Sequence, residues 1–203
     1  MLGRRQILFQ ALGLTVLGAL PAQGADGSLL KRFGAPKTRV QGGTRSGRGK
    51  AQPEVLLSEE PALSATADPD LFWYLSADYG LRVELTLTPV GGTEPLLHQV
   101  MKRGAAAGIH ALSLKDADVR LAEGQDHVFA LTLVPDPTVR TADVSARGTL
   151  RFVPHALFAD ARAAAAAGYW VDAFAMADPA LRVALLEDVD LPRPADWLMH
   201  QTA

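Results

Sequence analysis

A strict alternation of polar and apolar side chains runs through Arg82-Val83-Glu84-Leu85-Thr86-Leu87-Thr88. Successive side chains of an extended strand point to opposite faces, so Val83, Leu85 and Leu87 share one face and the polar residues share the other. The same period runs through residues 144–152, and a third apolar row occurs between residues 129 and 133. Strands with one apolar and one polar face are typical of antiparallel sheets that bury a single side.

Shorter strand-like segments accompany these three, at 54–58, 71–76, 96–101, 109–114 and 119–121. Turn-forming sequences separate them: Asp68-Pro69-Asp70, Asp78-Tyr79-Gly80, Gly91-Gly92, Glu123-Gly124 and Pro135-Asp136-Pro137. Many short strands at near-regular spacing predict an all-β, antiparallel, Ig-like sandwich over residues 54–153. A parallel α/β fold would need strands that are apolar on both faces, with helices between them.

The pattern changes to that of helices after the last long strand, which predicts a helical appendage over 154–203 that packs on the sandwich. Helices are expected at 156–167, 169–177, 179–189 and 195–200, and we expect Pro192 and Pro194 to break the third helix before the fourth begins. The stretch Gly168-Tyr169-Trp170-Val171-Asp172-Ala173 resembles the core of a single tetratricopeptide-type helical hairpin. One hairpin cannot bury its own apolar face, so we expect Trp170, together with Phe174 and Trp197, to seal the helices against the sandwich.

The beginning of the chain is typical of an export signal. Arg4 and Arg5 precede an apolar run of 14 residues, 7–20, which is shorter than the roughly 20 residues that a membrane-spanning helix needs. Pro21 and small residues follow, which favours cleavage after Gly24 and a signal peptide over 1–24. Both Sec and twin-arginine export fit the pattern. We therefore expect a periplasmic or secreted protein with no transmembrane segment after signal cleavage.

Charge is distributed unevenly along the chain. Seven basic residues and no acid lie between residues 31 and 50, whereas residues 51–203 contain 11 basic and 21 acidic residues. The glycine-rich segment 25–53 is expected to be a flexible basic arm. It could bind an anionic envelope polymer, although solvation or contact with the acidic body of the protein is favoured. Nucleic acid is not an expected partner of an exported, acidic chain.

No residue pattern predicts a catalytic centre, a metal site or a cofactor. The chain has no cysteine, which excludes disulfides, zinc thiolates and thiol nucleophiles. The histidines do not stand at metal-ligand spacing and are expected at the surface or at strand ends: His98, His110, His127, His155 and His200. No G-x-S-x-G nucleophile motif is present. The acids are too numerous for sequence spacing alone to single out a catalytic pair.

Five residues are candidates for binding. Trp73 and Tyr74 are adjacent on a short strand, so one ring should face the core, and the other could face solvent and stack on a sugar or a partner side chain. A core tryptophan with a neighbour that covers a sheet edge is favoured over this binding role. Arg140 and Asp143 flank the turn before the last long strand; a structural pair that holds the turn is favoured over a ligand site. Trp170 is the fifth candidate, on the helical hairpin.

Four separated phrases of the sequence resemble one bacterial family. They are Gly34-Ala35-Pro36 with residues 39–45, the aromatic strand 71–74, the stretch 121–152 and the hairpin 167–173. Together they are similar to the domain-of-unknown-function family numbered 928, over nearly all of the expected mature chain. The resemblance implies an exported bacterial protein. It implies no activity, cofactor or catalytic residue, and a disulfide of any relative cannot be transferred to a chain without cysteine.

These observations favour a non-catalytic envelope protein that acts as a protein-interaction or accessory module, with another envelope protein as its partner. The alternative is a sandwich that binds carbohydrate or anionic polymer. A hydrolase with dispersed carboxylates is a third, less favoured hypothesis. A large apolar patch on the helices would favour the first, an exposed aromatic row on a sheet would favour the second, and a deep cleft with converging acids and histidine would favour the third.

Overall fold

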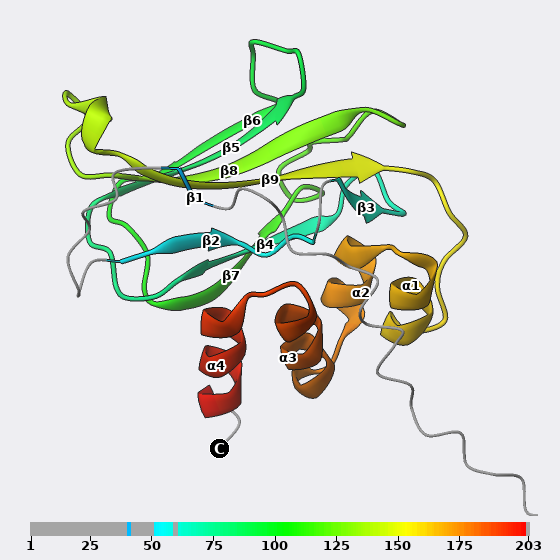
Figure 1. The fold of residues 1–203 in the computed structure, drawn as a ribbon. Helices are drawn as coiled ribbons and strands as arrows, with labels where there is room; N and C mark the ends of the chain where they lie inside the picture. The colour runs from blue at the N-terminus through cyan, green and yellow to red at the C-terminus, as the bar shows by residue number, and fades with distance from the viewer. Residues whose placement is uncertain (1–39, 42–50, 59–60, 202–203) are drawn as a thin grey trace, which may run out of the picture.

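The computed structural model describes residues 40–41, 51–58 and 61–201, which form two β-sheets and a layer of four helices (Figure 1). The expected signal peptide and most of the expected basic arm lie outside these residues. The strands come first: β1 (Val40–Gln41), β2 (Pro53–Val55), β3 (Ala62–Ser64), β4 (Asp70–Leu75), β5 (Arg82–Pro89), β6 (Leu97–Met101), β7 (Gly108–Ser113), β8 (Asp126–Val134) and β9 (Val144–Phe152). The helices follow: α1 (Ala161–Ala167), α2 (Trp170–Met176), α3 (Pro179–Asp188) and α4 (Pro192–Gln201).

The larger sheet has the strand order β1-β9-β8-β5-β6. Strand β3 also pairs with β9, on the side of β9 that faces away from β8. Only the pairing of β3 with β9 is parallel. The alternation in the sequence becomes the inner face of this sheet, where these side chains are at most 2% exposed: Val83, Leu85, Leu87, Phe129, Leu131, Leu133, Ala146 and Leu150. The three long strands that the alternation predicts are therefore the centre of the larger sheet.

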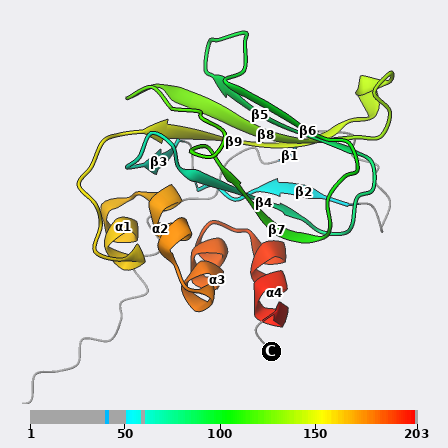
Figure 2. The same ribbon diagram turned by 180° about the vertical axis from the view of Figure 1, so that it is seen from behind.

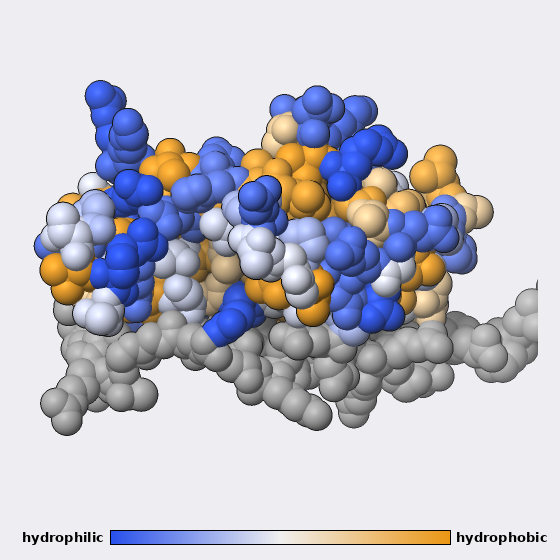
Figure 3. All heavy atoms as spheres, turned by 90° about the horizontal axis from the view of Figure 1, so that it is seen from above, coloured by the Kyte–Doolittle hydropathy of each residue, from blue (hydrophilic) through white to orange (hydrophobic). Residues whose placement is uncertain are grey.

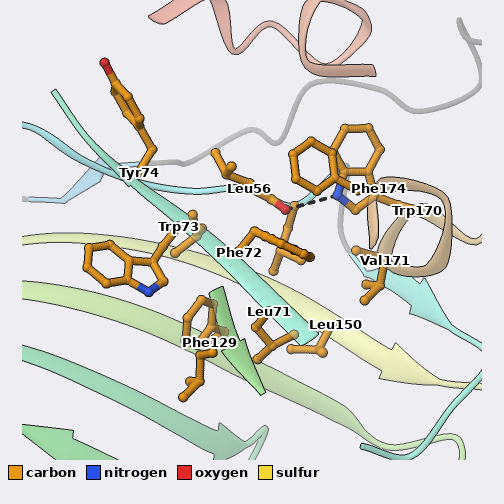
Figure 4. Close-up of a cluster of buried hydrophobic side chains, with 14 of the residues drawn as sticks. Leu56, Leu71, Phe72, Trp73, Tyr74, Phe129, Leu150, Trp170, Val171 and Phe174 are labelled. Atoms are coloured by element: carbon orange, nitrogen blue, oxygen red, sulfur yellow. Dashed lines mark hydrogen bonds between the residues drawn. The ribbon is translucent and has the colours of Figure 1, made fainter. Parts of the chain in front are cut away.

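The smaller sheet, β2-β4-β7, packs against this inner face. Its central strand, β4, is apolar on both sides, and Leu71 and Trp73 point toward Phe129 of the larger sheet (Figure 4). Gly148 of β9 allows the two sheets to approach closely, because a Cβ at this position would lie 3.0 Å from the Leu57 side chain. Antiparallel pairing thus dominates both sheets, and a shared apolar core joins them.

The four helices cover the other face of the smaller sheet, as two opposite views show (Figures 1 and 2). The Trp170 indole N–H donates a hydrogen bond of 3.0 Å to the carbonyl of Leu56, and Phe174 meets Phe72 edge to face with ring centroids 5.1 Å apart (Figure 4). The Arg182 guanidinium lies over both phenyl rings and donates to the Phe174 carbonyl. The expected packing of Trp170 and Phe174 against the sheet is confirmed, and Trp197 packs on Gly108 of β7.

The ends of the helices follow local sequence signals. Asp160 caps α1 by accepting from the Ala163 N–H, and Gly168 ends it with a left-handed conformation, φ +88°. Asp178 caps α3 in the same way, by accepting from the Leu181 N–H. The third helix ends at Asp188, before Pro192 and Pro194 as expected, but the fourth helix begins at Pro192 and not at residue 195, so both prolines lie in the first turn of α4. Prolines are tolerated there since the first N–H groups of a helix have no partner within it.

Other elements differ from the sequence prediction at the edges of the fold. The expected strand at 119–121 does not form, and residues 156–160 precede α1 instead of beginning it. Strands β1 and β3 have two and three residues, which is too short for periodicity to reveal, and β1 lies inside the segment expected to be a flexible arm. Among the residues that the structure describes, no helix is long and apolar enough to span a membrane.

Replacing Trp170 by phenylalanine should destabilise the fold. The change removes the hydrogen-bond donor to Leu56 and leaves unfilled volume in a side-chain site that is 0% exposed. The combined cost should be about 2–4 kcal/mol of unfolding free energy, measured by urea denaturation. Trp197→Phe is the control, since Trp197 is only partly buried and should lose less. Equal losses for the two variants would contradict the role assigned to Trp170.

Candidate functional site

Glu84 is a buried carboxylate on the outer face of β5, with 6% of its surface exposed. Arg82 Nε lies 2.6 Å from one of its oxygens, and Arg140 reaches both oxygens, with Nη2 at 2.9 Å and Nη1 at 3.3 Å. Arg140 also donates from Nε to Asp143 Oδ2 at 2.6 Å, and His98 Nε2 lies 4.0 Å from Glu84. These residues, the Glu84 network, fasten the turn before β9 to the centre of the larger sheet.

The network holds Glu84 in its ionised form. Burial alone would raise the pKa of Glu84, but the hydrogen bond from Arg140 and the charges of Arg140 and Arg82 outweigh burial and lower that pKa. A carboxyl group that stays ionised near neutral pH cannot act as a general acid. The Glu84 network is therefore suited to holding a turn in place and unsuited to general-acid catalysis.

The predicted pair of Arg140 and Asp143 is confirmed as a contact, but the sequence did not indicate its third member. Glu84 lies 56 residues before Arg140 in the chain. Its only signal is an acidic residue on a strand face that otherwise carries Arg82, Thr86 and Thr88. Glu84 and Asp143 both engage the guanidinium of Arg140, so the charge of Arg140 is compensated within the protein.

The aromatic candidates lie inside the protein. Trp73 is 2% exposed and its ring stacks on that of His110, the residue opposite it on β7, with centroids 4.1 Å apart. Tyr74 points to the other side of β4, as the alternation predicts, but α4 covers it and it is 5% exposed. Burial, followed by the charge of Glu54, raises the pKa of its hydroxyl. Trp170 is 0% exposed, so none of the three rings offers a free face to a ligand.

His127 begins the inner face of β8 and is 0% exposed, although the sequence suggested a surface or strand-end position. Its Nδ1 lies 3.0 Å from the carbonyl of Gln125, and its Nε2 has no hydrogen-bond partner among the described residues. Burial lowers the pKa of this imidazole, against the opposing effects of the Gln125 carbonyl and the Asp126 charge. His127 is thus a neutral core residue in the folded protein.

An open cavity lies between α3 and α4, on the side of these helices away from the smaller sheet. It has a volume of about 530 Å³ and is lined by Asp178, Pro179, Ala180, Val183 and Met199. We call it the α3–α4 groove. Sequence reasoning missed it because it treated α3 as a helix with one apolar face. The available signal was Val183, an apolar residue outside the buried row of Leu181, Leu185 and Leu186.

The rest of the described part of the chain offers no candidate metal centre. No cluster of three or more histidine, aspartate or glutamate side chains there could hold a metal ion. The outer face of the larger sheet mixes polar and apolar side chains when the molecule is seen from above (Figure 3). Trp73 and Tyr74, the aromatic candidates for an exposed binding face, lie in the other sheet and are buried.

Fold and site together define a two-sheet β-protein with a C-terminal layer of helices and an open apolar groove between the last two. The chain belongs to the family described as Domain of Unknown Function (DUF928), whose model matches residues 40–179. That match includes both sheets, α1 and α2, and it ends at the first residue of α3. No curated protein and no solved structure matches the chain significantly.

Replacing Glu84 by glutamine should reduce stability most at neutral pH. The pKa of Glu84 in the folded protein is below its ordinary value of 4.5. The ionised carboxylate therefore contributes to the unfolding free energy above about pH 4.5, and this contribution is lost as pH falls through the folded-state pKa. We expect a loss of about 1–3 kcal/mol at pH 7 and a smaller loss at pH 3, measured by urea unfolding. The exposed loop variant Asp116→Asn is the control. A loss that is independent of pH would contradict this assignment.

Replacing His127 by leucine should stabilise the protein, and more so in mild acid. Burial lowers the pKa of His127 below 6.5 in the folded protein. As pH falls, the imidazole is therefore protonated in the unfolded chain at a higher pH than in the folded protein, and stability falls as pH drops below about 6.5. The leucine variant lacks this proton uptake and fills the same apolar position. Thermal melting at pH 8 and pH 5 should show a larger gain at pH 5. The exposed His200→Leu serves as the control, and an equal gain at both pH values would show that His127 does not titrate on unfolding.

Proposed function

We propose that this chain is a non-catalytic, exported interaction module that binds a segment of another envelope protein in the α3–α4 groove. The groove itself is the observation that carries the proposal. It is open, it is lined mainly by apolar side chains, and it lies on helices whose opposite sides are already packed on the smaller sheet. Met199, which lines the groove on α4, is 43% exposed, and Met176 at the end of α2 is 47% exposed. Methionine is common at surfaces that adapt to apolar partners.

The charges of these two helices suggest the chemistry of the partner. Residues 178–201 contain five acidic residues and two arginines. Both arginines are already engaged, Arg182 over Phe72 and Phe174, and Arg193 with the buried Glu54 at 2.6 Å. The surface around the groove is therefore acidic. We infer a partner segment with one or two apolar side chains that fill the groove, flanked by lysine or arginine.

The architecture is compatible with this role. We interpret the two sheets as an Ig-like sandwich and the hairpin of α1 and α2 as a single tetratricopeptide-type unit, both of which are scaffolds for protein contact. The N-terminal pattern of Arg4, Arg5 and the apolar run supports export, and thus a periplasmic or secreted location. The basic segment before the sandwich is a second surface through which anionic envelope polymer could retain the protein.

The other two hypotheses lack a supporting observation. A carbohydrate-binding sheet would present aromatic rings to solvent, and Tyr74, on which that hypothesis depended, is covered by α4. A hydrolase would need acids that can exchange protons in a shared cleft. The buried carboxylate Glu84 is instead held ionised by arginines, and the α3–α4 groove has Asp178 as its one acidic lining residue.

A photocrosslinking residue at position 180 should identify the partner. Ala180 lines the groove and is exposed, so the replacement does not disturb the core. We expect repeated crosslinking to one protein in the envelope of the source cells, through a peptide with apolar residues flanked by lysine or arginine. A synthetic copy of that peptide should bind the purified chain in calorimetry, and Ala180→Arg should weaken binding by roughly tenfold or more, through steric overlap and charge repulsion.

The matched control is position 167, an exposed alanine at the end of α1, outside the groove. A crosslinker there should not capture the same protein, and Ala167→Arg should leave the affinity for the peptide unchanged. Equal capture at both positions, or binding that Ala180→Arg does not affect, would contradict the groove as the binding site. Recovery of polysaccharide without a protein would favour the carbohydrate-binding hypothesis.

A further inference from the structure

The larger sheet ends in an open edge at β6. Among the strands that the structure describes, β6 pairs with β5 alone. Soluble proteins commonly protect such edges with proline, lysine or other charges inside the strand. The sequence Leu97-His98-Gln99-Val100-Met101 contains no proline, lysine or acid. This edge therefore lacks the usual protection against pairing with another strand.

Hydrogen bonds at the end of β5 show how its backbone groups alternate between its two neighbours. The Val90 N–H donates to the Asp126 carbonyl at the start of β8, at 2.8 Å. The Leu87 carbonyl accepts from the Leu96 N–H beside β6, at 2.7 Å. In an antiparallel sheet these directions alternate from residue to residue. Even-numbered residues of β5 thus bond to β8, and odd-numbered residues bond to β6.

The pairing of β5 with β6 shows which backbone groups of β6 face the open edge. Gln99 lies opposite Leu85, an odd-numbered residue of β5, so the backbone groups of Gln99 point to β5. The backbone groups of its neighbours, His98 and Val100, therefore point away from β5, to the open edge. An incoming strand would form its hydrogen bonds with these two residues.

Charges of opposite sign flank the two ends of β6. Glu94 precedes the strand, whereas Lys102 and Arg103 follow it, and all three are exposed. If two copies of β6 pair in antiparallel orientation about a two-fold axis at Gln99, the acidic end of each copy lies beside the basic end of the other. The edge is thus complementary in charge to itself, which is the requirement for a symmetric dimer contact.

We propose that two copies of this chain associate through β6, with the two-fold axis at Gln99, and join their larger sheets into one. In this register His98 of each copy lies opposite Val100 of the second copy, and the two residues exchange backbone hydrogen bonds. Leu97 and Met101 lie on the same face of β6 and meet Met101 and Leu97 of the second copy. The exposed side chains of Leu81 and Leu96, 51% and 44% exposed, provide apolar surface beside the contact.

This inference concerns a different surface from the α3–α4 groove and goes beyond the proposed function. The pairing of two short strands is smaller than a standard protein interface, so the dimer should depend on concentration. Sedimentation velocity of the purified full chain over a concentration series should show a reversible equilibrium between monomer and dimer. The groove variant Ala180→Arg should show the same equilibrium, which separates the outcome of this experiment from that of the proposed function.

Val100→Pro tests the strand pairing. Proline removes an N–H group that points to the open edge, so it should leave the bonds to β5 intact, and prolines are accepted on edge strands for this reason. We expect dimerisation to weaken by roughly tenfold or more, with an unchanged circular dichroism spectrum. The control is Val139→Ala, an exposed valine outside β6, which should dimerise like the wild type.

A charge exchange tests the register and does not depend on the proline variant. Two variants place like charges together at the contact: Glu94→Lys, and the double variant Lys102→Glu/Arg103→Glu. Each variant by itself should remain monomeric at concentrations where the wild type dimerises. An equal mixture of the two restores opposite charges at both ends and should form a heterodimer. A wild-type chain that stays monomeric up to its solubility limit would overturn the proposal. So would a dimer that persists in all of these variants, or a mixture that does not associate.

Discussion

Strand β4 carries large apolar side chains on both of its faces, and neither face can be left in water without a substantial loss of stability. Leu71, Trp73 and Leu75 require one cover, which the larger sheet provides. Phe72 and Tyr74 require a second, which the C-terminal helices provide. The layered order of sheet, sheet and helices follows from this constraint. It also explains why Phe174 of α2 packs against Phe72, why Trp170 donates to the Leu56 carbonyl, and why Arg182 lies over the rings of Phe72 and Phe174.

The sequence predicted those parts of the fold that depend on local pattern. Alternation revealed β5, β8 and β9, and the caps at Asp178 and Gly168 were readable because each acts on its own helix end. The remaining parts depend on contacts between distant residues. The burial of Tyr74 requires the position of α4, and the Glu84 network joins residues 56 positions apart. The α3–α4 groove could not be predicted for the same reason, since two helices and their packing form it.

The two inferred surfaces lie in different parts of the chain. The α3–α4 groove begins where the match to the DUF928 model ends, and most of α3 and all of α4 lie beyond it. The open edge of β6 and the Glu84 network lie inside the match. A contact between two copies through β6 would thus belong to the part of the fold that the family model describes. Binding in the groove would depend on α3 and α4, which lie almost wholly outside the matched residues.

The hydrogen bond between Trp170 and Leu56 joins residues 114 positions apart, and β3 pairs with β9 through Ala62 and Leu150, which lie 88 positions apart. Contacts of such long range must close large loops before they contribute any favourable energy, and proteins dominated by them fold slowly. Among the described strands, β1 and β3 pair only with β9, so neither has a partner strand until β9 is available. Folding should be late and cooperative, which keeps the chain extended during passage through a narrow translocation channel if it leaves the cytosol unfolded.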